Sequence, residues 1–388
     1  MKLFDYFKPV NEKIIAKSKL LSENSFGKKT SIYYIKDKNI PNINSFDIAI
    51  LGIPESRASN NDACSKAPDI IREKLYELFI PDVNLKIIDL GNLIISKTLN
   101  DTYFAIRDVL AELINSNTIP IIIGGSEDLN YGLYLALENI RNNVNITNIN
   151  SLISYTSNEK ELENYHFLNK ILNKKDNNVN NYTNIGHQQY FNNIDDVNTL
   201  NNLFFNTIRL GDAKKNIIEV EPYIRDSNIF SINVNSIKQS DAPANIHPSP
   251  NGFYGDEICL LSRFAGFSNN IKVFGIFDIN PDFDINFSTS SLAAQAIWHF
   301  IEGFYKRDND IPNNDNSKFL KFTVSIENCQ HSLIFYKNKI NDKWWLKVPN
   351  NNSTKKYIII ACTHNDYNKA CSNEIPDRWW KTYQKINN

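Results

Sequence analysis

The sequence lacks the features that would place it in several common protein classes. Its 42 Lys and Arg are balanced by 43 Asp and Glu, for a formal net charge of −1. It therefore has no basic excess that would attract nucleic acid or an anionic membrane. The N-terminus has no apolar signal-like segment, and no stretch approaches the roughly 18 apolar residues that a membrane span needs. We expect neither a nucleic-acid partner nor a membrane partner, and a cytoplasmic location.

Cysteine is also scarce, and no C-x-x-C pair occurs. The five residues are Cys64, Cys259, Cys329, Cys362 and Cys371. Their odd number and scattered positions favour reduced thiols over a disulfide framework. Asparagine, in contrast, is abundant in predicted helices, strands and loops alike, which we interpret as a bias of composition. The glycine pair Gly124-Gly125 has neither a G-x-G-x-x-G pattern nor a following Lys-Ser/Thr, so it is a weak phosphate-binding signal.

Apolar runs that end in glycine or proline alternate with amphipathic segments over most of the chain. The clearest runs lie at 46–54, 119–125 and 273–281. Strands separated by helices predict a parallel sheet with helices on both faces. We assign residues 1–308 to this α/β domain, with an irregular segment at 1–45 and a polar, irregular insertion at about 154–193.

The pattern changes near residue 319, where apolar and polar residues begin to alternate. This alternating segment and three further strand-like runs, at 333–336, 344–348 and 357–361, predict a small antiparallel β add-on at 319–388. The aromatic-rich tail at 375–383 would need an apolar surface to cover it.

Two asparagines mark the end of one buried strand. Asn233 and Asn235 follow the apolar pair Ile229-Phe230. The two asparagines are two residues apart, so in a strand their side chains lie on the same face. Ligands in open α/β sheets bind at the carboxyl ends of strands. The geometry suits a pair of metal-binding carboxylates, but both positions are amides.

An ordered set of segments resembles the ureohydrolase superfamily of arginase, agmatinase and formimidoylglutamase, and formimidoylglutamase is nearest. The segments are Ala67-Pro68 with Ile71-Arg72, 124–128, 145–151, 231–235 with 240–243, 250–257 and 278–281. The resemblance implies an arginase-like three-layer α/β/α sandwich with a central parallel sheet, often assembled as a trimer or hexamer. It also implies hydrolysis of a guanidino or formimino group by water that bridges two manganese ions.

The resemblance further indicates where the metal ligands of the family would fall. Within one residue of register, the positions are Glu127, Thr147, Ile149, Ser151, Asn233 and Asn235. Only Glu127 is a carboxylate, with Asp128 beside it, and Ile149 cannot bind a metal. Two manganese ions bring four positive charges and prefer anionic oxygen or imidazole ligands. We therefore expect no metal and no other cofactor, and we predict a pseudoenzyme that acts as a binding or scaffold protein.

The alternative is an active formimidoylglutamase or related amidinohydrolase with a displaced or mononuclear manganese site. Its candidate cleft residues are Glu127, Asp128, Asp241 and Asp278. Under this alternative, the protein would hydrolyse a linear amidine or guanidino carbon–nitrogen bond.

Other polar groups are weaker candidates. His187 and His247 lie in predicted loops without ligand spacing, and Cys259 lies on an apolar helix face, which favours a buried thiol over a nucleophile. A third interpretation makes the add-on from Phe319 onward a docking module for a protein partner, and the same segment could instead cover an exposed face of the core.

Overall fold

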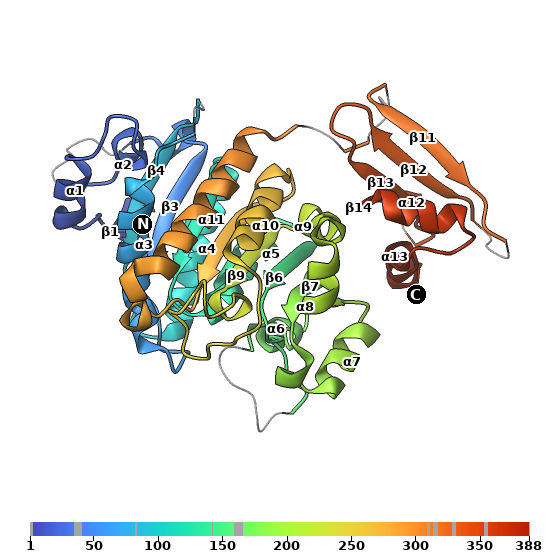
Figure 1. Ribbon diagram of the computed structural model, residues 1–388, viewed down its shortest axis with the longest axis horizontal. Helices are drawn as coiled ribbons and strands as arrows, with labels where there is room; N and C mark the ends of the chain where they lie inside the picture. Colours follow the sequence, from blue (N-terminus) through green and yellow to red (C-terminus); the bar gives the residue numbers. More distant parts are fainter. Residues whose placement is uncertain are drawn as a thin grey trace.

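The computed structural model describes residues 3–34, 41–81, 84–141, 143–158, 166–308, 311–312, 317–327, 331–352 and 356–387. Figure 1 shows a large α/β core and a smaller C-terminal unit beside it. The core contains a ten-stranded sheet, and the C-terminal unit contains a four-stranded sheet.

The core sheet is almost entirely parallel. Its order is β1-β4-β3-β5-β10-β9-β6-β7-β8, with β2 beside β4, and only the β1–β4 pair is antiparallel. The strands are β1 Phe7–Lys8, β2 Ser31–Ile32, β3 Ile48–Ile53, β4 Ile87–Leu93, β5 Ile119–Gly124, β6 Val144–Ile149, β7 Val179–His187, β8 Asn206–Arg209, β9 Ile229–Asn233 and β10 Val273–Phe277. The carboxyl ends of β5, β10, β9 and β6 therefore lie side by side.

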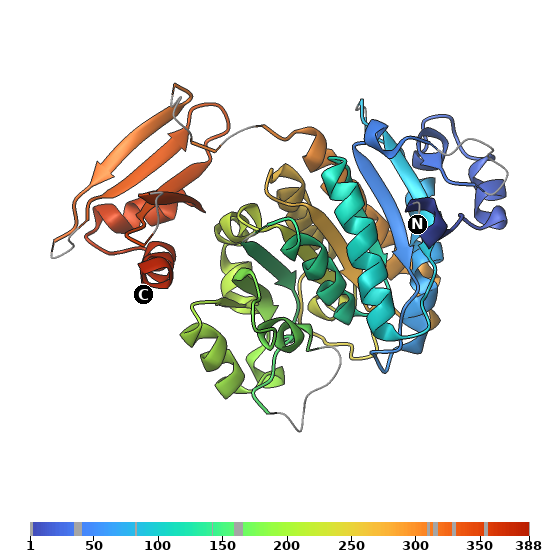
Figure 2. The same cartoon turned by 180° about the vertical axis from the view of Figure 1, so that it is seen from behind.

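Helices bury both faces of this sheet. They are α1 Glu12–Ser18, α2 Phe26–Lys29, α3 Ala67–Glu77, α4 Leu99–Asn115, α5 Asn130–Glu138, α6 Phe167–Leu172, α7 Ile194–Asn202, α8 Leu210–Lys215, α9 Glu221–Arg225, α10 Gly255–Phe267 and α11 Ser288–Tyr305. One apolar cluster joins the sheet to α3, α10 and α11, and a second joins it to α4, α5 and α6 (Figures 1 and 2). Successive residues of β3, such as Ile50 and Leu51, belong to different clusters. This is the predicted three-layer α/β/α sandwich.

The C-terminal unit is the predicted antiparallel sheet, with two helices in addition. Its elements are β11 Phe319–Val324, β12 Leu333–Asn338, β13 Trp344–Pro349, β14 Tyr357–Cys362, α12 His364–Cys371 and α13 Asp377–Asn387. The aromatic tail forms α13, and its Trp379 is buried with Trp344 and Leu346 of the same unit. The indole of Trp379 donates a hydrogen bond to the Lys347 carbonyl at 3.1 Å. The tail therefore covers its own sheet.

Residues 159–165 lie outside the described ranges, and the rest of the segment 154–193 differs from the polar, irregular insertion that we expected. It contains α6 and the nine-residue strand β7, which pairs with both β6 and β8. The asparagines of β7 have partners: Asn180 donates to Asn145 Oδ1 at 2.8 Å, and Asn184 donates to the Leu152 carbonyl at 2.9 Å. These bonds offset the cost of burying amides in a strand.

The structure also bears on the expectations for the cysteines and for membrane-spanning segments. Cys64, Cys259, Cys362 and Cys371 are free thiols, and Cys329 lies outside the described ranges. Within those ranges, no helix has the length and apolar character that crossing a bilayer requires.

Candidate functional site

Four neighbouring strands bring polar side chains to one edge of the core sheet. Glu127 lies in a short 3-10 turn after β5, Asp278 directly follows β10, Asn233 ends β9, and Asn148 lies one residue before the end of β6. Because these strands are parallel and adjacent, the four residues converge at the carboxyl edge. The Glu127 residue is only 3% exposed.

Hydrogen-bond donors surround the Glu127 carboxylate. Asn148 Nδ2 and Ser154 Oγ donate to Oε1 at 2.5 and 2.9 Å, and Asn233 Nδ2 donates to Oε2 at 2.8 Å. Asn150 Nδ2 reaches both oxygens, at 2.9 and 2.8 Å. Hydrogen bonds to a charged acceptor offset the cost of burying it. The charge of Glu127 is therefore stabilised by neutral amides and a hydroxyl.

Asn233 links Glu127 to a second carboxyl group. Its Nδ2 also donates to Asp278 Oδ2 at 2.7 Å. Asp278 has φ of +66°, a left-handed conformation that is uncommon for a residue with a side chain. Two bonds hold its backbone: its N–H donates to the Gly125 carbonyl at 2.9 Å, and its carbonyl accepts from Asn61 Nδ2 at 2.9 Å.

Burial disfavours the charged forms of both acids. Burial raises the pKa of Glu127, and the hydrogen bonds from Asn148, Ser154, Asn150 and Asn233 act in the opposite direction. Burial raises the pKa of Asp278 well above its usual value, and the negative charge of Glu127 raises it further. The two acids together supply at most two negative charges.

The cluster does not fit a binuclear metal centre. In the part of the chain that the structure describes, no group of three or more His, Cys, Asp or Glu could hold a metal ion. Two divalent cations would bring four positive charges against two carboxyl groups. The amide N–H groups of Asn148, Asn150 and Asn233 also occupy the carboxylate oxygens that a cation would use.

A small cavity of about 120 Å³ lies beside the cluster. It is lined by Ala58, Ser59, Asn60, Glu127, Leu152, Asn235, Ile246, His247 and Asp278. Pockets for small-molecule ligands usually measure about 300–1,000 Å³. This cavity is therefore well below the usual size of a ligand pocket.

The carboxyl end of β6 presents different residues from those we expected. The Thr147 hydroxyl contacts the Tyr223 carbonyl and the Ser227 hydroxyl, away from Glu127, and Ile149 is part of the apolar core. The residues directed at the site are instead Asn148, Asn150 and Leu152. The register is one residue later than the assignment to Thr147, Ile149 and Ser151. The i, i+2 spacing of Asn148 and Asn150, which matches that of Asn233 and Asn235, was the signal that could have identified them.

Two of the candidate aspartates are engaged elsewhere. Asp128 accepts hydrogen bonds from the Tyr103 and Ser126 hydroxyls, both at 2.5 Å. Asp241 accepts from the Gly255 N–H at 2.9 Å, where α10 begins. Neither lines the small cavity, so only Glu127 and Asp278 of the four predicted cleft carboxylates do.

The histidine and cysteine candidates do not lie together in the structure. His247 lines the small cavity, whereas the buried His187 lies at the end of β7 and does not line it. Cys259 is buried on α10, and burial raises its thiol pKa to about 11. A thiol with that pKa is a poor nucleophile near neutral pH.

A parallel sheet covered on both faces, with polar groups at the carboxyl edge, defines an α/β protein whose site lies where such folds bind ligands. The chain belongs to the arginase family, whose sequence model matches residues 46–302.

Individual relatives agree with this assignment. The formimidoylglutamase of Staphylococcus haemolyticus is 26% identical over 285 residues, which cover 69% of this chain and 91% of the relative. A Trypanosoma cruzi formiminoglutamase solved with Mn²⁺ has a TM-score of 0.63 at 18% identity, and the match covers 69% of this chain and 97% of that chain. The formimidoylglutamase of Bacillus subtilis has a TM-score of 0.60 at 19% identity, over 76% of this chain and 99% of that chain.

Proposed function

We propose that this arginase-family protein has lost the binuclear manganese site of its catalytic relatives and acts as a non-catalytic binding or scaffold protein. The observation that carries the proposal is the set of donors around Glu127. Three amides and one hydroxyl donate to its two oxygens, in the place where a metal centre would need anionic ligands.

Electrostatics supports the loss of metal. Several buried carboxylates without a cation would repel one another and pay a desolvation cost. Replacement of carboxylates by asparagine keeps the shape and the hydrogen bonding but removes the charge. The cavity of about 120 Å³ beside the cluster also supports a non-catalytic role, because an amino-acid-sized substrate needs more room.

Manganese content tests the proposal directly. We expect the protein, purified after growth with added Mn²⁺ and dialysed, to contain well under one equivalent of manganese by ICP-MS. The B. subtilis formimidoylglutamase, treated in parallel, serves as the control for metal uptake and retention. Two tightly held manganese ions per chain would refute the proposal.

Turnover separates the proposal from an active amidinohydrolase. We expect no release of ammonia or formamide from formimidoylglutamate, and no urea from arginine or agmatine, with or without Mn²⁺. Manganese-dependent turnover that Glu127→Gln abolishes would instead establish an enzyme with a displaced or mononuclear site.

A further inference from the structure

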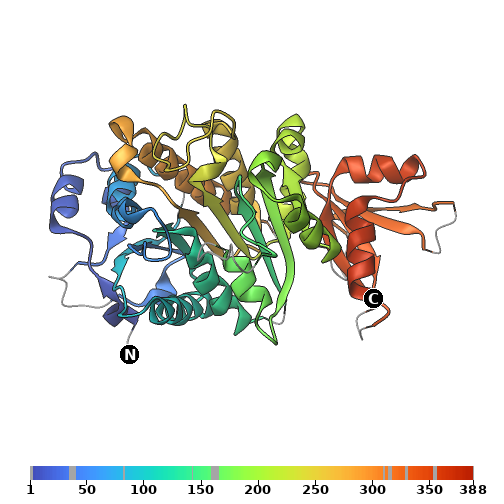
Figure 3. The same cartoon turned by 90° about the horizontal axis from the view of Figure 1, so that it is seen from below.

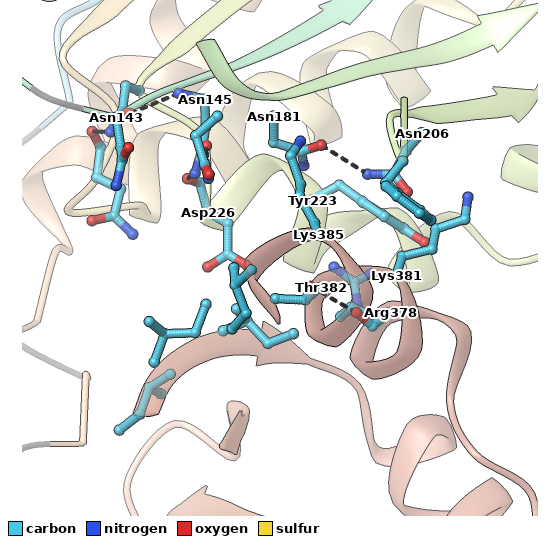
Figure 4. Close-up of a pocket in the computed structure, with 18 of the residues that line it drawn as sticks. Asn143, Asn145, Asn181, Asn206, Tyr223, Asp226, Arg378, Lys381, Thr382 and Lys385 are labelled. Atoms are coloured by element: carbon cyan, nitrogen blue, oxygen red, sulfur yellow. Dashed lines mark hydrogen bonds between the residues drawn. The ribbon is translucent and has the colours of Figure 1, made fainter. Parts of the chain in front are cut away.

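A second, larger cavity lies between the core and the C-terminal unit. Its volume is about 310 Å³, and Figure 4 shows its lining. The core contributes residues at the start of β6, β7 and β8, and the C-terminal unit contributes residues of β14 and α13. Asn145 of β6 lines this cavity, whereas Asn148 near the other end of β6 contacts Glu127. The cavity therefore lies at the amino ends of the parallel strands, whereas the Glu127 cluster lies at their carboxyl ends.

The charged side chains of this cavity are mostly cationic. Arg141, Arg378, Lys381 and Lys385 line it, and Asp226 is the single carboxylate among its lining residues. Figure 4 shows Arg378, Lys381 and Lys385 on α13 facing the core strands. Arg141 belongs to the core and the other three cations belong to α13, so all four lie close together only when α13 packs against the core.

Few of these cations have a protein counter-ion. Among the described residues, no ion pair within 4 Å joins Arg141, Lys381 or Lys385 to a carboxylate. Lys385 Nζ is buried without a hydrogen-bond partner in the described structure and lies 4.5 Å from the centre of the Phe205 ring. Burial lowers the pKa of Lys385 to about 8.

Arg378 is held in position on the same wall. Its side chain is 9% exposed, its guanidinium lies 3.7 Å from the centre of the Tyr223 ring, and its Nε is 3.8 Å from Asp366 Oδ2. The Nε atom makes no hydrogen bond to a described residue. The guanidinium is therefore oriented by packing but keeps hydrogen-bonding capacity.

Amides form much of the opposite wall, where seven asparagines line the cavity. Asn180 donates to Asn145 at 2.8 Å, and Asn206 donates to Asn181 at 3.4 Å. Such a wall offers donors and acceptors to hydroxyl or ester oxygens. If the two units only had to pack together, apolar residues at this interface would stabilise the contact more, because unpaired buried cations cost free energy.

We propose that this cavity binds a small organic oxyanion with two or more negative charges, a phosphate ester or a polycarboxylate, and that the bound anion holds α13 against the core. An anion between Arg378, Lys381 and Lys385 would supply the missing counter-charge and accept charge-assisted hydrogen bonds. The volume of about 310 Å³ is at the lower end of the range for ligand pockets, as expected for a small metabolite.

Titration calorimetry and thermal unfolding of the full chain, at constant ionic strength, test this proposal. The probes are glycerol 3-phosphate for phosphate esters, citrate for polycarboxylates, and glycerol as the uncharged control. We expect millimolar or tighter binding of one of the two anions, and a rise in Tm of roughly 3–6 °C at saturation. The anion that binds identifies the chemical class. Absence of binding by both anions at 10 mM, or an equal shift with sodium chloride, would overturn the proposal.

Two variants localise the binding. Lys385→Met and Lys381→Gln should each weaken binding of the anion about tenfold or more, because each removes a charge-assisted contact. Lys385→Met should leave the Tm of the free protein equal or higher, since it replaces a buried, unpartnered amine. The matched control is Lys321→Gln, an exposed lysine on β11, the strand farthest from β14 in the same sheet. Wild-type affinity in both test variants would overturn the proposal.

Discussion

At the scale of single residues, the main feature of the candidate site is the set of hydrogen bonds to one buried carboxylate. Glu127 would bear a large desolvation cost alone, and the amides of Asn148, Asn150 and Asn233 offset it with direct hydrogen bonds. A carboxylate suits this arrangement because it only accepts hydrogen bonds, and each of these neighbouring groups donates one.

Glu127→Gln should therefore destabilise the fold. The new amide N–H₂ would face Asn150 or Asn233, so donors would meet donors, and we expect a loss of about 2–3 kcal/mol in the free energy of unfolding at pH 7. Urea unfolding followed by tryptophan fluorescence measures it. The control is Glu77→Gln, whose side chain is 51% exposed and which should change stability by less than about 0.5 kcal/mol. A neutral effect of Glu127→Gln would show that the carboxylate does not depend on these donors.

At the scale of elements, the predictable features were those that depend on apolar periodicity. Runs such as Ile121-Ile122-Ile123 and their alternation with helices predicted the doubly covered parallel sheet. The register of β6 could not be predicted in the same way, because both faces of a parallel strand are buried and the apolar pattern does not distinguish them. Only the partners of Asn148 and Thr147 in space show which one faces Glu127.

Strand β7 and helix α13 were missed for different physical reasons. Asn180, Asn181 and Asn184 give β7 a loop-like composition, and the partners that stabilise them, such as Asn145, come from distant segments. Trp379 and Tyr383 of helix α13 pack against the sheet of their own unit, whereas the sequence alone also allowed the tail to cover the core. Long-range partners decided the structure in both cases.

The segment after α9 makes stability depend on pH. Asp226 accepts two hydrogen bonds from the Ala361 N–H of β14, at 3.1 and 2.9 Å, and burial raises its pKa to about 6. The unfolded pKa is about 3.9, so the folded state binds the proton more tightly, and this contribution to stability is lost as the pH rises from about 4 to about 6. The full loss is about 3 kcal/mol, from about two pH units.

Asp226→Asn should remove that loss. We expect a variant close to the wild type at pH 4 but more stable by up to about 3 kcal/mol at pH 7.5, measured by denaturant unfolding at both pH values. The control is Asp342→Asn, whose side chain is 77% exposed and which should show no such pH-dependent gain. An Asp226→Asn variant with the same pH dependence as the wild type would contradict the assignment.

At the scale of the whole molecule, the C-terminal unit lies at one end of the core, as Figure 3 shows. Arg225 of α9 provides one polar connection: its Nη2 donates to the carbonyls of Trp344 and Cys362 at 3.1 and 3.0 Å. Its guanidinium also lies 4.5 Å from the centre of the Trp345 ring. Together with Asp226, this residue joins β13 and β14 to the core.

Arg225→Ala should weaken the docking of the C-terminal unit on the core without unfolding either one. The loss of two charge-assisted bonds and the cation–π contact should cost about 3 kcal/mol of docking free energy. We expect faster proteolytic cleavage between α11 and β11, followed by mass spectrometry, with little change in circular dichroism. The control is Arg107→Ala, a partly exposed arginine on α4 paired with Asp108, which should leave cleavage unchanged. Unchanged cleavage of Arg225→Ala would show that other contacts hold the unit.

The attachment of the C-terminal sheet has an evolutionary consequence. Arg225 binds two backbone carbonyls and Asp226 binds a backbone N–H, so these anchors recognise the main chain of β13 and β14. Any sequence that still forms these strands would present the same carbonyls and N–H. Mutations can therefore alter the outward-facing residues of the sheet while the joint to the α/β core persists.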